Sequence, residues 1–266
     1  MKYTFGLIGA GNMGGAVARA VSLRCKDGIL SNRTPEKAQA LAEDLGFTAG
    51  SNEEAARESR YLFLGVKPHL MAGMLADLQP VLRARSEPPI LVPMAAGLSI
   101  EQIQNMAGGD YPVIRIMPNT PVAVGQGVVF YKSSPGVTQE MEAGFLALME
   151  EAGKLFPLEE SLMDVGAAVA GCGPAYAYLV MDAMADGGVA CGLPRPDAIR
   201  FAAQTLLGAA QMVLETGKHP DQLKNEVCSP GGSTIQGVRT LEQRAVRAAM
   251  MDAVIAASEK NAALGK

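Results

Sequence analysis

The segment Thr4–Gly14, with the sequence T-F-G-L-I-G-A-G-N-M-G, constrains the fold more than any other part of the chain. It begins with a short apolar run, which is typical of a strand. The pattern G-x-G-x-x-G follows at residues 9–14, and an alanine-rich stretch at residues 16–23 predicts a helix. A strand, a glycine turn and a helix in this order are what a dinucleotide-binding turn requires.

Each glycine of this turn has its own expected role. Gly9 makes the tight turn, because a residue without a Cβ tolerates positive φ. Gly11 lets the backbone approach a pyrophosphate, and Gly14 lets the helix pack closely on the strand. The unpaired N–H groups at the helix N-terminus then attract the phosphates. The alternative is an ordinary strand-to-helix turn, because glycine-rich turns are common.

The end of the second predicted strand, at residues 29–31, indicates which nucleotide is bound. Enzymes that bind NAD carry an Asp or Glu there, whereas this chain has the sequence S-N-R-T at residues 31–34. Arg33 can pair with a 2′-phosphate through two hydrogen bonds, and Ser31, Asn32 or Thr34 can add donors. The sequence therefore predicts NADP(H), with NAD(H) as the other nucleotide, unless Arg33 is only a solvated loop charge.

Predicted strands and helices alternate through the first half of the chain. Apolar runs at residues 61–66, 89–93 and 113–116 are typical of buried parallel strands. Pro35 is expected to begin a helix, and Asn52 is expected to cap the next one. This alternation predicts an α/β fold with a doubly wound, mostly parallel sheet that binds ligands at its carboxyl edge. Lys67 lies at that edge, where it either positions a ligand or reaches into water.

From about residue 160 the strand pattern gives way to long helical stretches. They are rich in Ala, Leu and Met, and we expect them at residues 173–187, 196–215, 220–227 and 233–264. Several are apolar or small nearly all round, which indicates burial on most sides. About 100 residues of helix cannot cover that much apolar surface alone. We therefore expect this half to pack against a second copy, the alternative being the first domain of the same chain.

The turn at residues 229–234, with the sequence S-P-G-G-S-T, is the most chemically suggestive part of the second half. Two adjacent glycines remove side-chain bulk, and Ser233 and Thr234 then open a helix. Backbone N–H groups and the Thr234 hydroxyl can hold a small carboxylate there. The alternative is an ordinary break between helices with a Ser/Thr cap. Cys172, near a similar break, has no basic group placed to activate it as a nucleophile.

Composition excludes several classes of protein. The net charge of −4 gives no electrostatic footprint for nucleic acid or an anionic membrane surface. Two histidines and four widely separated cysteines predict no metal site, and the thiols are expected to be reduced, as in a cytoplasmic protein. The N-terminus mimics a secretory signal, but its glycines and Asn12 interrupt the apolar region, and no apolar run is long enough to span a bilayer.

Taken together, seven motifs in order resemble those of pyrroline-5-carboxylate reductase, the last enzyme of proline synthesis, over essentially the whole chain. They are Gly9–Gly14, Val66–Pro68, Ala95–Gly97, R-I-M-P-N-T-P at Arg115–Pro121, G-C-G-P-A-Y at Gly171–Tyr176, A-D-G-G at Ala185–Gly188 and S-P-G-G-S-T at Ser229–Thr234. Two departures are Cys172, where the family commonly has a serine, and Glu226, where some members carry an amide.

The resemblance implies an N-terminal NADP-binding Rossmann domain at residues 1–160 and an all-α dimerisation and substrate-binding domain at residues 161–266. It also implies interlocked homodimers that assemble further into rings. The residues implied to bind the cofactor are Ile8, Gly9, Ala10, Gly11, Asn12, Met13, Gly14, Asn32, Arg33, Asn52, Val66, Lys67, Pro68, Met94, Ala95 and Ala96. The residues implied to bind the substrate carboxylate and ring nitrogen are Ser229, Gly231, Gly232, Ser233 and Thr234.

The implied reaction passes a hydride from the nicotinamide to the imine carbon of 1-pyrroline-5-carboxylate and gives L-proline. An imine is basic enough to bind already protonated, so no histidine acid is required, and Thr234 is the expected catalytic residue. One rival is a β-hydroxyacid dehydrogenase or a related imine reductase; the dehydrogenase needs a catalytic lysine, for which Lys218 and Lys224 are the candidates. A rival of another class is a non-enzymatic NADP-binding sensor.

Overall fold

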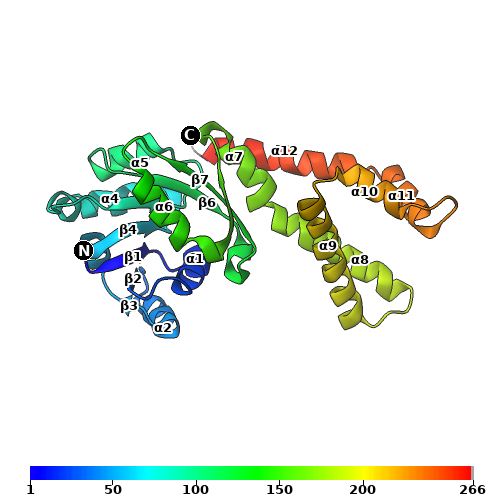
Figure 1. Cartoon of the computed structure of the whole chain (residues 1–266), viewed down its shortest axis with the longest axis horizontal. Helices are drawn as coiled ribbons and strands as arrows, with labels where there is room; N and C mark the ends of the chain where they lie inside the picture. Colours follow the sequence, from blue (N-terminus) through cyan, green and yellow to red (C-terminus); the bar gives the residue numbers. More distant parts are fainter. Residues whose placement is uncertain (265–266) are drawn as a thin grey trace. The chain divides into compact units, whose positions relative to one another are not determined.

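The computed structural model describes residues 1–264 and divides into two compact units (Figure 1). The first unit contains residues 1–172 together with the end of the chain from Ala257, and the second contains residues 173–256. The last two residues of the predicted helical domain, 265 and 266, lie outside the described residues. The first unit carries all the strands of the described chain, and the second is helical.

The larger sheet of the first unit has five strands, all paired in parallel in the order β3-β2-β1-β4-β5. They are β1 (Tyr3–Ile8), β2 (Gly28–Ser31), β3 (Thr48–Ala49), β4 (Ser59–Leu64) and β5 (Ile90–Pro93). This order confirms the predicted Rossmann-like sheet, in which the chain starts in the middle and winds outward in both directions.

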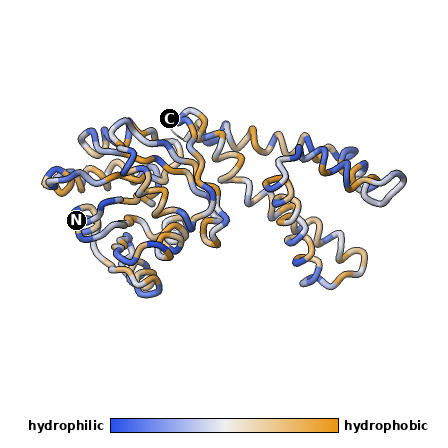
Figure 2. Tube along the Cα trace, in the orientation of Figure 1, coloured by the Kyte–Doolittle hydropathy of each residue, from blue (hydrophilic) through white to orange (hydrophobic). Residues whose placement is uncertain are grey.

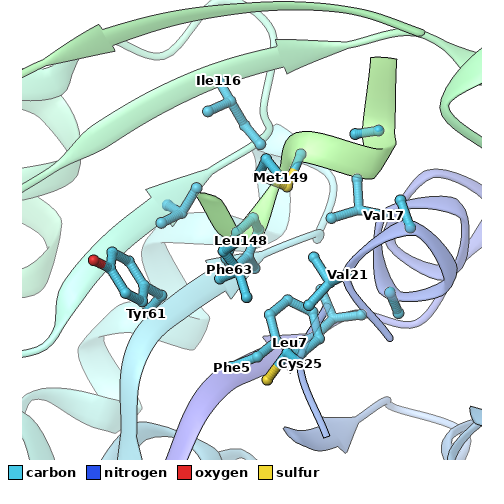
Figure 3. Close-up of a cluster of buried hydrophobic side chains, with 14 of the residues drawn as sticks. Phe5, Leu7, Val17, Val21, Cys25, Tyr61, Phe63, Ile116, Leu148 and Met149 are labelled. Atoms are coloured by element: carbon cyan, nitrogen blue, oxygen red, sulfur yellow. The ribbon is translucent and has the colours of Figure 1, made fainter. Parts of the chain in front are cut away.

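Helices cover both faces of this sheet. They are α1 (Asn12–Ser22), α2 (Pro35–Leu45), α3 (Asn52–Glu58), α4 (Pro68–Arg83), α5 (Ile100–Ala107) and α6 (Gln139–Leu148). Figure 3 shows one of the two cores, where Phe5 of β1 and Phe63 of β4 meet Val17 and Val21 of α1. Leu62 and Leu64 belong to a second core with side chains of α3, α4 and α5. Because both faces are covered, the strands are apolar throughout rather than alternating.

A second sheet of three strands extends the first unit. It consists of β6 (Ile114–Pro118), β7 (Gly127–Ser133) and β8 (Gly153–Pro157), with β6–β7 antiparallel and β7–β8 parallel. A single parallel bridge between Leu91 and Val113 joins it to the larger sheet. The 3-10 helix η1 (Thr120–Val124) connects β6 to β7. The predicted strand at residues 113–116 is present as β6, but the expected parallel pairing is wrong, because β6 pairs antiparallel with β7 in this second sheet. Neither β7 nor β8 was predicted from the sequence.

The second unit consists of helices at the predicted places. They are α8 (Gly173–Ala190), α9 (Arg195–Thr216), α10 (Pro220–Val227), α11 (Ser233–Gln243) and α12 (Val246–Leu264), the last of which returns the chain to the first unit. One expectation is wrong, because residues 233–264 form two helices rather than one. The break falls at Ala245, which has a φ of 55°. No glycine or proline marks it in the sequence.

Hydrophobic residues recur along the helices of the second unit (Figure 2). The single chain does not bury them: Leu179, Phe201 and Leu214 are 70%, 58% and 82% exposed. The buried side chains of α8 and α9 are the alanines Ala185, Ala198 and Ala202. The helices of the second unit therefore do not give one another the burial on most sides that their apolar sequences predict. None of the helices within residues 1–264 combines the length and the apolar character needed to cross a membrane.

Candidate functional site

Four parallel strands of the larger sheet end side by side at one edge. Ile8 at the end of β1 is opposite Ser31 on one side and Leu64 on the other, and Leu64 is opposite Pro93. Of the five segments predicted to bind the nucleotide, four lie at this carboxyl edge, namely residues 8–14, 32–33, 66–68 and 94–96. The register therefore gathers residues that are far apart in the sequence into one place.

Two glycines of the turn, Gly9 and Gly14, have the backbone geometry and close contacts that were predicted for them. Gly9 has a φ of +103°, and a Cβ there would lie 2.7 Å from the carbonyl carbon of Gly65. A Cβ on Gly14 would lie 2.1 Å from the carbonyl oxygen of Gly9. Both positions therefore require glycine for the turn and for close packing of α1. A Cβ on Gly11 would meet no heavy atom within 4 Å, so this position faces open space.

The N-terminus of α1 fits a phosphate group. Gly11 is its N-cap, no side chain caps the free N–H groups, and the first turn carries no acidic residue. Gly11 and Asn12 are exposed, and together with Ala10 and Lys37 they line an open depression. Uncapped N–H groups at a helix N-terminus carry a partial positive charge and attract anions. The chemistry of this turn therefore suits the pyrophosphate of a dinucleotide.

The segment after β2 presents a free cation. Arg33 is exposed, and it forms no ion pair with any carboxylate in residues 1–264. Asn32 donates from Nδ2 to the carbonyl oxygen of Thr34 at 3.1 Å, which shapes the loop. Ser31 is buried and faces the neighbouring segment rather than the solvent, so its expected role as a phosphate donor is wrong.

Asn52 is not the helix cap that the sequence analysis expected. Ser51 caps α3: its side chain accepts from the N–H of Glu54, and the Glu54 side chain accepts from the N–H of Ser51. Asn52 is therefore the first residue of the helix, half-buried, and Oδ1 of its amide accepts a hydrogen bond of 2.6 Å from Ser31 Oγ. This places the Asn52 amide beside the end of β2.

Two further segments complete the edge. Lys67 is exposed at the N-cap of α4, and Pro68 begins that helix. The N–H of Met94 donates to the carbonyl oxygen of Leu64 at 3.2 Å, so residues 94–96 stay close to the end of β4. Ala95 is buried, whereas Met94 and Ala96 are partly exposed. Ala95 and Ala96 bring only small side chains to this edge.

The turn S-P-G-G-S-T lies in the second unit and leads into α11. Gly231 has a φ of +71°, and the N–H of Gly232 donates to the carbonyl oxygen of Ser229 at 3.1 Å. Gly232 is the N-cap of α11 and brings no side chain to the free N–H groups. Ser233 is exposed and Thr234 is half-buried. The turn thus combines free backbone donors with a hydroxyl, as binding of a small carboxylate requires.

The lysines considered for a dehydrogenase are both paired. Lys218 Nζ lies 2.8 Å from Glu226 Oε1, and this ion pair lowers the pKa of the Glu226 carboxyl. Lys224 Nζ lies 2.7 Å from Asp221 Oδ1. His219 Nδ1 accepts from the N–H of Asp221 at the start of α10. These contacts give the polar side chains beside Pro220 a structural role within this segment. Residues 1–264 contain no cluster of side chains suited to hold a metal ion.

The R-I-M-P-N-T-P motif has a structural role that the sequence analysis did not assign. Arg115 in β6 is 3% exposed, and its Nη1 lies 2.9 Å from Glu160 Oε1. Asn119 donates from Nδ2 to the carbonyl oxygen of Ala170 at 3.0 Å and accepts from the N–H of Val128 at 2.9 Å. Both side chains hold the segment that leads towards α8. A charged residue inside an apolar strand was the signal for this role.

Two family models match the chain. The model for pyrroline-5-carboxylate reductase dimerisation matches residues 160–264. A second model, described as NADP oxidoreductase coenzyme F420-dependent, matches residues 4–97. The two matches therefore fall on the helical half and on the nucleotide-binding half.

Curated proteins and solved structures agree over the full length. Pyrroline-5-carboxylate reductase from Glycine max is 40% identical over 268 residues, which cover 98% of this chain and 95% of that protein. The enzyme of that name from Escherichia coli (strain K12) is 37% identical and covers 100% of both. The crystal structure of Plasmodium falciparum pyrroline carboxylate reductase with NADP bound has a TM-score of 0.89 and 30% identity and covers 100% of both chains.

Proposed function

Because this chain belongs to the pyrroline-5-carboxylate reductase family, we infer that it reduces 1-pyrroline-5-carboxylate to L-proline with NADPH and that its two halves divide the work. Residues 1–160 hold the nucleotide, and residues 161–266 bind the substrate and form the dimer. The observation that carries the proposal is the common sheet edge that brings together four of the five predicted nucleotide-binding segments. NADH is the other nucleotide that this edge can accept.

The nucleotide is held by the glycine turn and by the segments beside it. The free N–H groups of α1 bind the pyrophosphate, and Arg33 binds the 2′-phosphate that distinguishes NADPH from NADH. Asn32 precedes Arg33 in the chain, and Asn52 is hydrogen-bonded to Ser31 at the end of β2. Residues 66–68 and 94–96 line the path towards the nicotinamide. When bound, NADPH supplies the hydride. The chain's part is to orient the nucleotide and to leave one face of its ring open to the substrate.

The substrate is a small ring that carries a carboxylate and an imine. The free backbone N–H groups at the start of α11 and the hydroxyl of Ser233 bind the carboxylate, while the N–H of Gly232 stays bonded to the carbonyl oxygen of Ser229 and closes the turn. The Thr234 hydroxyl oxygen accepts the N–H of the protonated ring nitrogen, which orients the imine carbon for attack. A protonated imine is already an electrophile, so no side chain has to deliver a proton to the reacting atom. This explains why neither His69 nor His219 is needed for the reaction.

The second unit forms a homodimer. Its exposed apolar side chains, among them Leu179, Phe201 and Leu214, exceed what the surface of a monomer carries, and a dimerisation model covers this part of the chain. Further assembly of dimers into a ring follows the family's pattern. We place the enzyme in the cytoplasm, where its four free cysteines stay reduced. Light scattering on the eluting protein should give twice the chain mass or an even multiple, and a monomer at micromolar concentration would contradict the dimer.

One assay separates this function from its rivals. NADPH consumption is followed with 1-pyrroline-5-carboxylate, and NADP⁺ reduction is followed with a panel of 3-hydroxyacids. We expect turnover with the ring imine and none with the hydroxyacids. Turnover of a 3-hydroxyacid instead would establish the dehydrogenase. Tight binding of NADPH without turnover of either substrate class would establish a sensor.

A further inference from the structure

The hydrogen bond between Ser31 and Asn52 joins two segments at the nucleotide edge. The chain leaving β3 runs beside the chain leaving β2, because Ala49 is opposite Leu30 and the N–H of Gly50 donates to the carbonyl oxygen of Leu30 at 3.0 Å. Ser31 Oγ then donates to Asn52 Oδ1 at 2.6 Å. Arg33, with its unpaired charge, is two residues beyond Ser31. The Asn52 amide is therefore fixed beside the segment that carries the cation.

The direction of this hydrogen bond decides what the Asn52 amide offers to a ligand. A primary amide has one acceptor oxygen and two N–H donors. The oxygen of Asn52 is occupied by a serine that is 3% exposed, so it points inward. No group in residues 1–264 accepts a hydrogen bond from Asn52 Nδ2, and the residue is half-buried, so its donors remain available. Without the serine hydroxyl, the amide could turn its oxygen outward and repel an anion.

We propose that Ser31 is a positioning residue for nucleotide choice: it holds the Asn52 amide with its N–H donors towards the 2′-phosphate of NADPH. This inference rests on the proposed function, since it assumes that the nucleotide lies along this edge. Ser31 touches neither the nucleotide nor the substrate. Its effect is selective, because NADH has no phosphate to receive the donors of Asn52.

The test measures the Kd of NADPH and of NADH separately, by nucleotide fluorescence, in the full-length protein. We expect Ser31→Ala to weaken NADPH by about three- to tenfold and to leave NADH within about twofold. Arg33→Ala is the reference variant and should weaken NADPH by about tenfold or more, again selectively. Ser22→Ala is the matched control, because Ser22 is also buried and donates to the carbonyl oxygen of Arg19 within α1. It should change neither Kd.

A double-mutant cycle shows whether Ser31 acts through Asn52. In an Asn52→Ala background, Ser31→Ala should cause no further loss of NADPH affinity. Asn52→Asp keeps an acceptor for Ser31 and replaces the donors by a carboxylate oxygen, so it should weaken NADPH more than Ser31→Ala does. Asn52→Asp leaves Ser31 unchanged, so it tests the direction of the amide donors even where Ser31→Ala folds poorly.

Two results would overturn the inference. One is equal weakening of NADPH and NADH by Ser31→Ala, and the other is an effect of Ser31→Ala that persists in full in the Asn52→Ala background. Failure of the proposed function has a different signature, because a wild-type protein that reduces no 1-pyrroline-5-carboxylate can still show the selective Kd pattern. Loss of that pattern with normal turnover would contradict only the role of Ser31.

Discussion

Arg115 in β6 is paired with Glu160, with 2.9 Å between Nη1 and Oε1, in a part of the first unit where the arginine side chain is only 4% exposed. The same Glu160 oxygen accepts the N–H of Ile100 at 2.8 Å. Asp164 lies 3.7 Å from Nη2, and its carbonyl oxygen accepts from the Asn261 side chain at 3.1 Å. One buried cation of β6 thus pairs with two carboxylates of the segment after β8, and that segment in turn contacts the start of α5 and the end of α12.

Replacing this cation should destabilise the fold. Arg115→Met leaves two carboxylates without their partner, each 32% exposed, and we expect a loss of about 2–3 kcal/mol, less than for a fully buried pair. The control is Arg60→Met, which breaks a surface pair with Glu140 and should cost less than about 1 kcal/mol. Urea unfolding at one fixed protein concentration measures both. Equal losses in the two variants would show that burial of Arg115 contributes nothing.

Two glycines of the nucleotide turn should respond in opposite ways to the same substitution. In Gly11→Ala the new Cβ has no neighbouring atom, so the free energy of unfolding should change by less than about 1 kcal/mol. The Kd for NADPH should nevertheless rise by about tenfold or more, because the Cβ faces the nucleotide. Gly14→Ala places a Cβ 2.1 Å from a backbone oxygen and should lower the melting temperature. Gly73→Ala in α4, which also faces open space, should leave the Kd unchanged. Normal NADPH affinity in Gly11→Ala would remove the turn from the nucleotide site.

The buried thiol of Cys25 should make the free energy of unfolding fall at high pH. Burial, and then the hydrogen bond to the Asp27 carboxylate, raises its pKa from 9.0 to about 11. Unfolding frees the thiol to ionise at its ordinary pKa, so the stabilisation is complete below pH 9 and is lost as pH rises towards about 11. The loss should reach about 2–3 kcal/mol. Urea midpoints across this range should fall less steeply in Cys25→Ala than in Cys191→Ala, which removes an exposed thiol. If the urea midpoints of the two variants fall equally steeply with pH, the pKa of the Cys25 thiol is not raised.

The catalytic assignment of Thr234 has a control in the same helix. Thr234→Ala should lower kcat/KM for 1-pyrroline-5-carboxylate by about ten- to a hundredfold, or roughly 1.4–2.7 kcal/mol, because the ring nitrogen loses its hydrogen bond. Thr240→Ala removes a hydroxyl that donates to the carbonyl oxygen of Gln236 in α11 and should leave kcat/KM nearly unchanged. Steady-state kinetics at saturating NADPH measure kcat/KM for both variants. If the two variants behave alike, Thr234 has no special role.

The strands and helices around the nucleotide edge could be predicted because local patterns determine them. Three local patterns predict these elements, and the packed structure keeps all of them. They are the glycines at turns, Pro35 at the start of α2 and the uninterrupted apolar runs of the parallel strands. The cap of α3 can also be predicted from the sequence, because Ser51 and Glu54 have the spacing of a capping box, which favours Ser51 over the Asn that follows it.

Other features depend on contacts that no local pattern contains. The break at Ala245 has neither glycine nor proline, and it is visible only in the backbone. The strand β7 is antiparallel to β6 and parallel to β8, a pairing that depends on long-range packing. Ser31 was one of three candidate donors to the phosphate, whereas its hydroxyl donates to Asn52 across 21 residues of sequence.

We infer that this chain delivers a hydride from NADPH to the imine carbon of a five-membered ring acid. The most direct test uses NADPH carrying deuterium at the transferable position, with 1-pyrroline-5-carboxylate, and mass and NMR analysis of the product. We expect L-proline with one deuterium on the ring carbon that was double-bonded to nitrogen, formed in equal amount to the NADPH consumed. Proline without the label, or NADPH that binds and is not consumed, would contradict it.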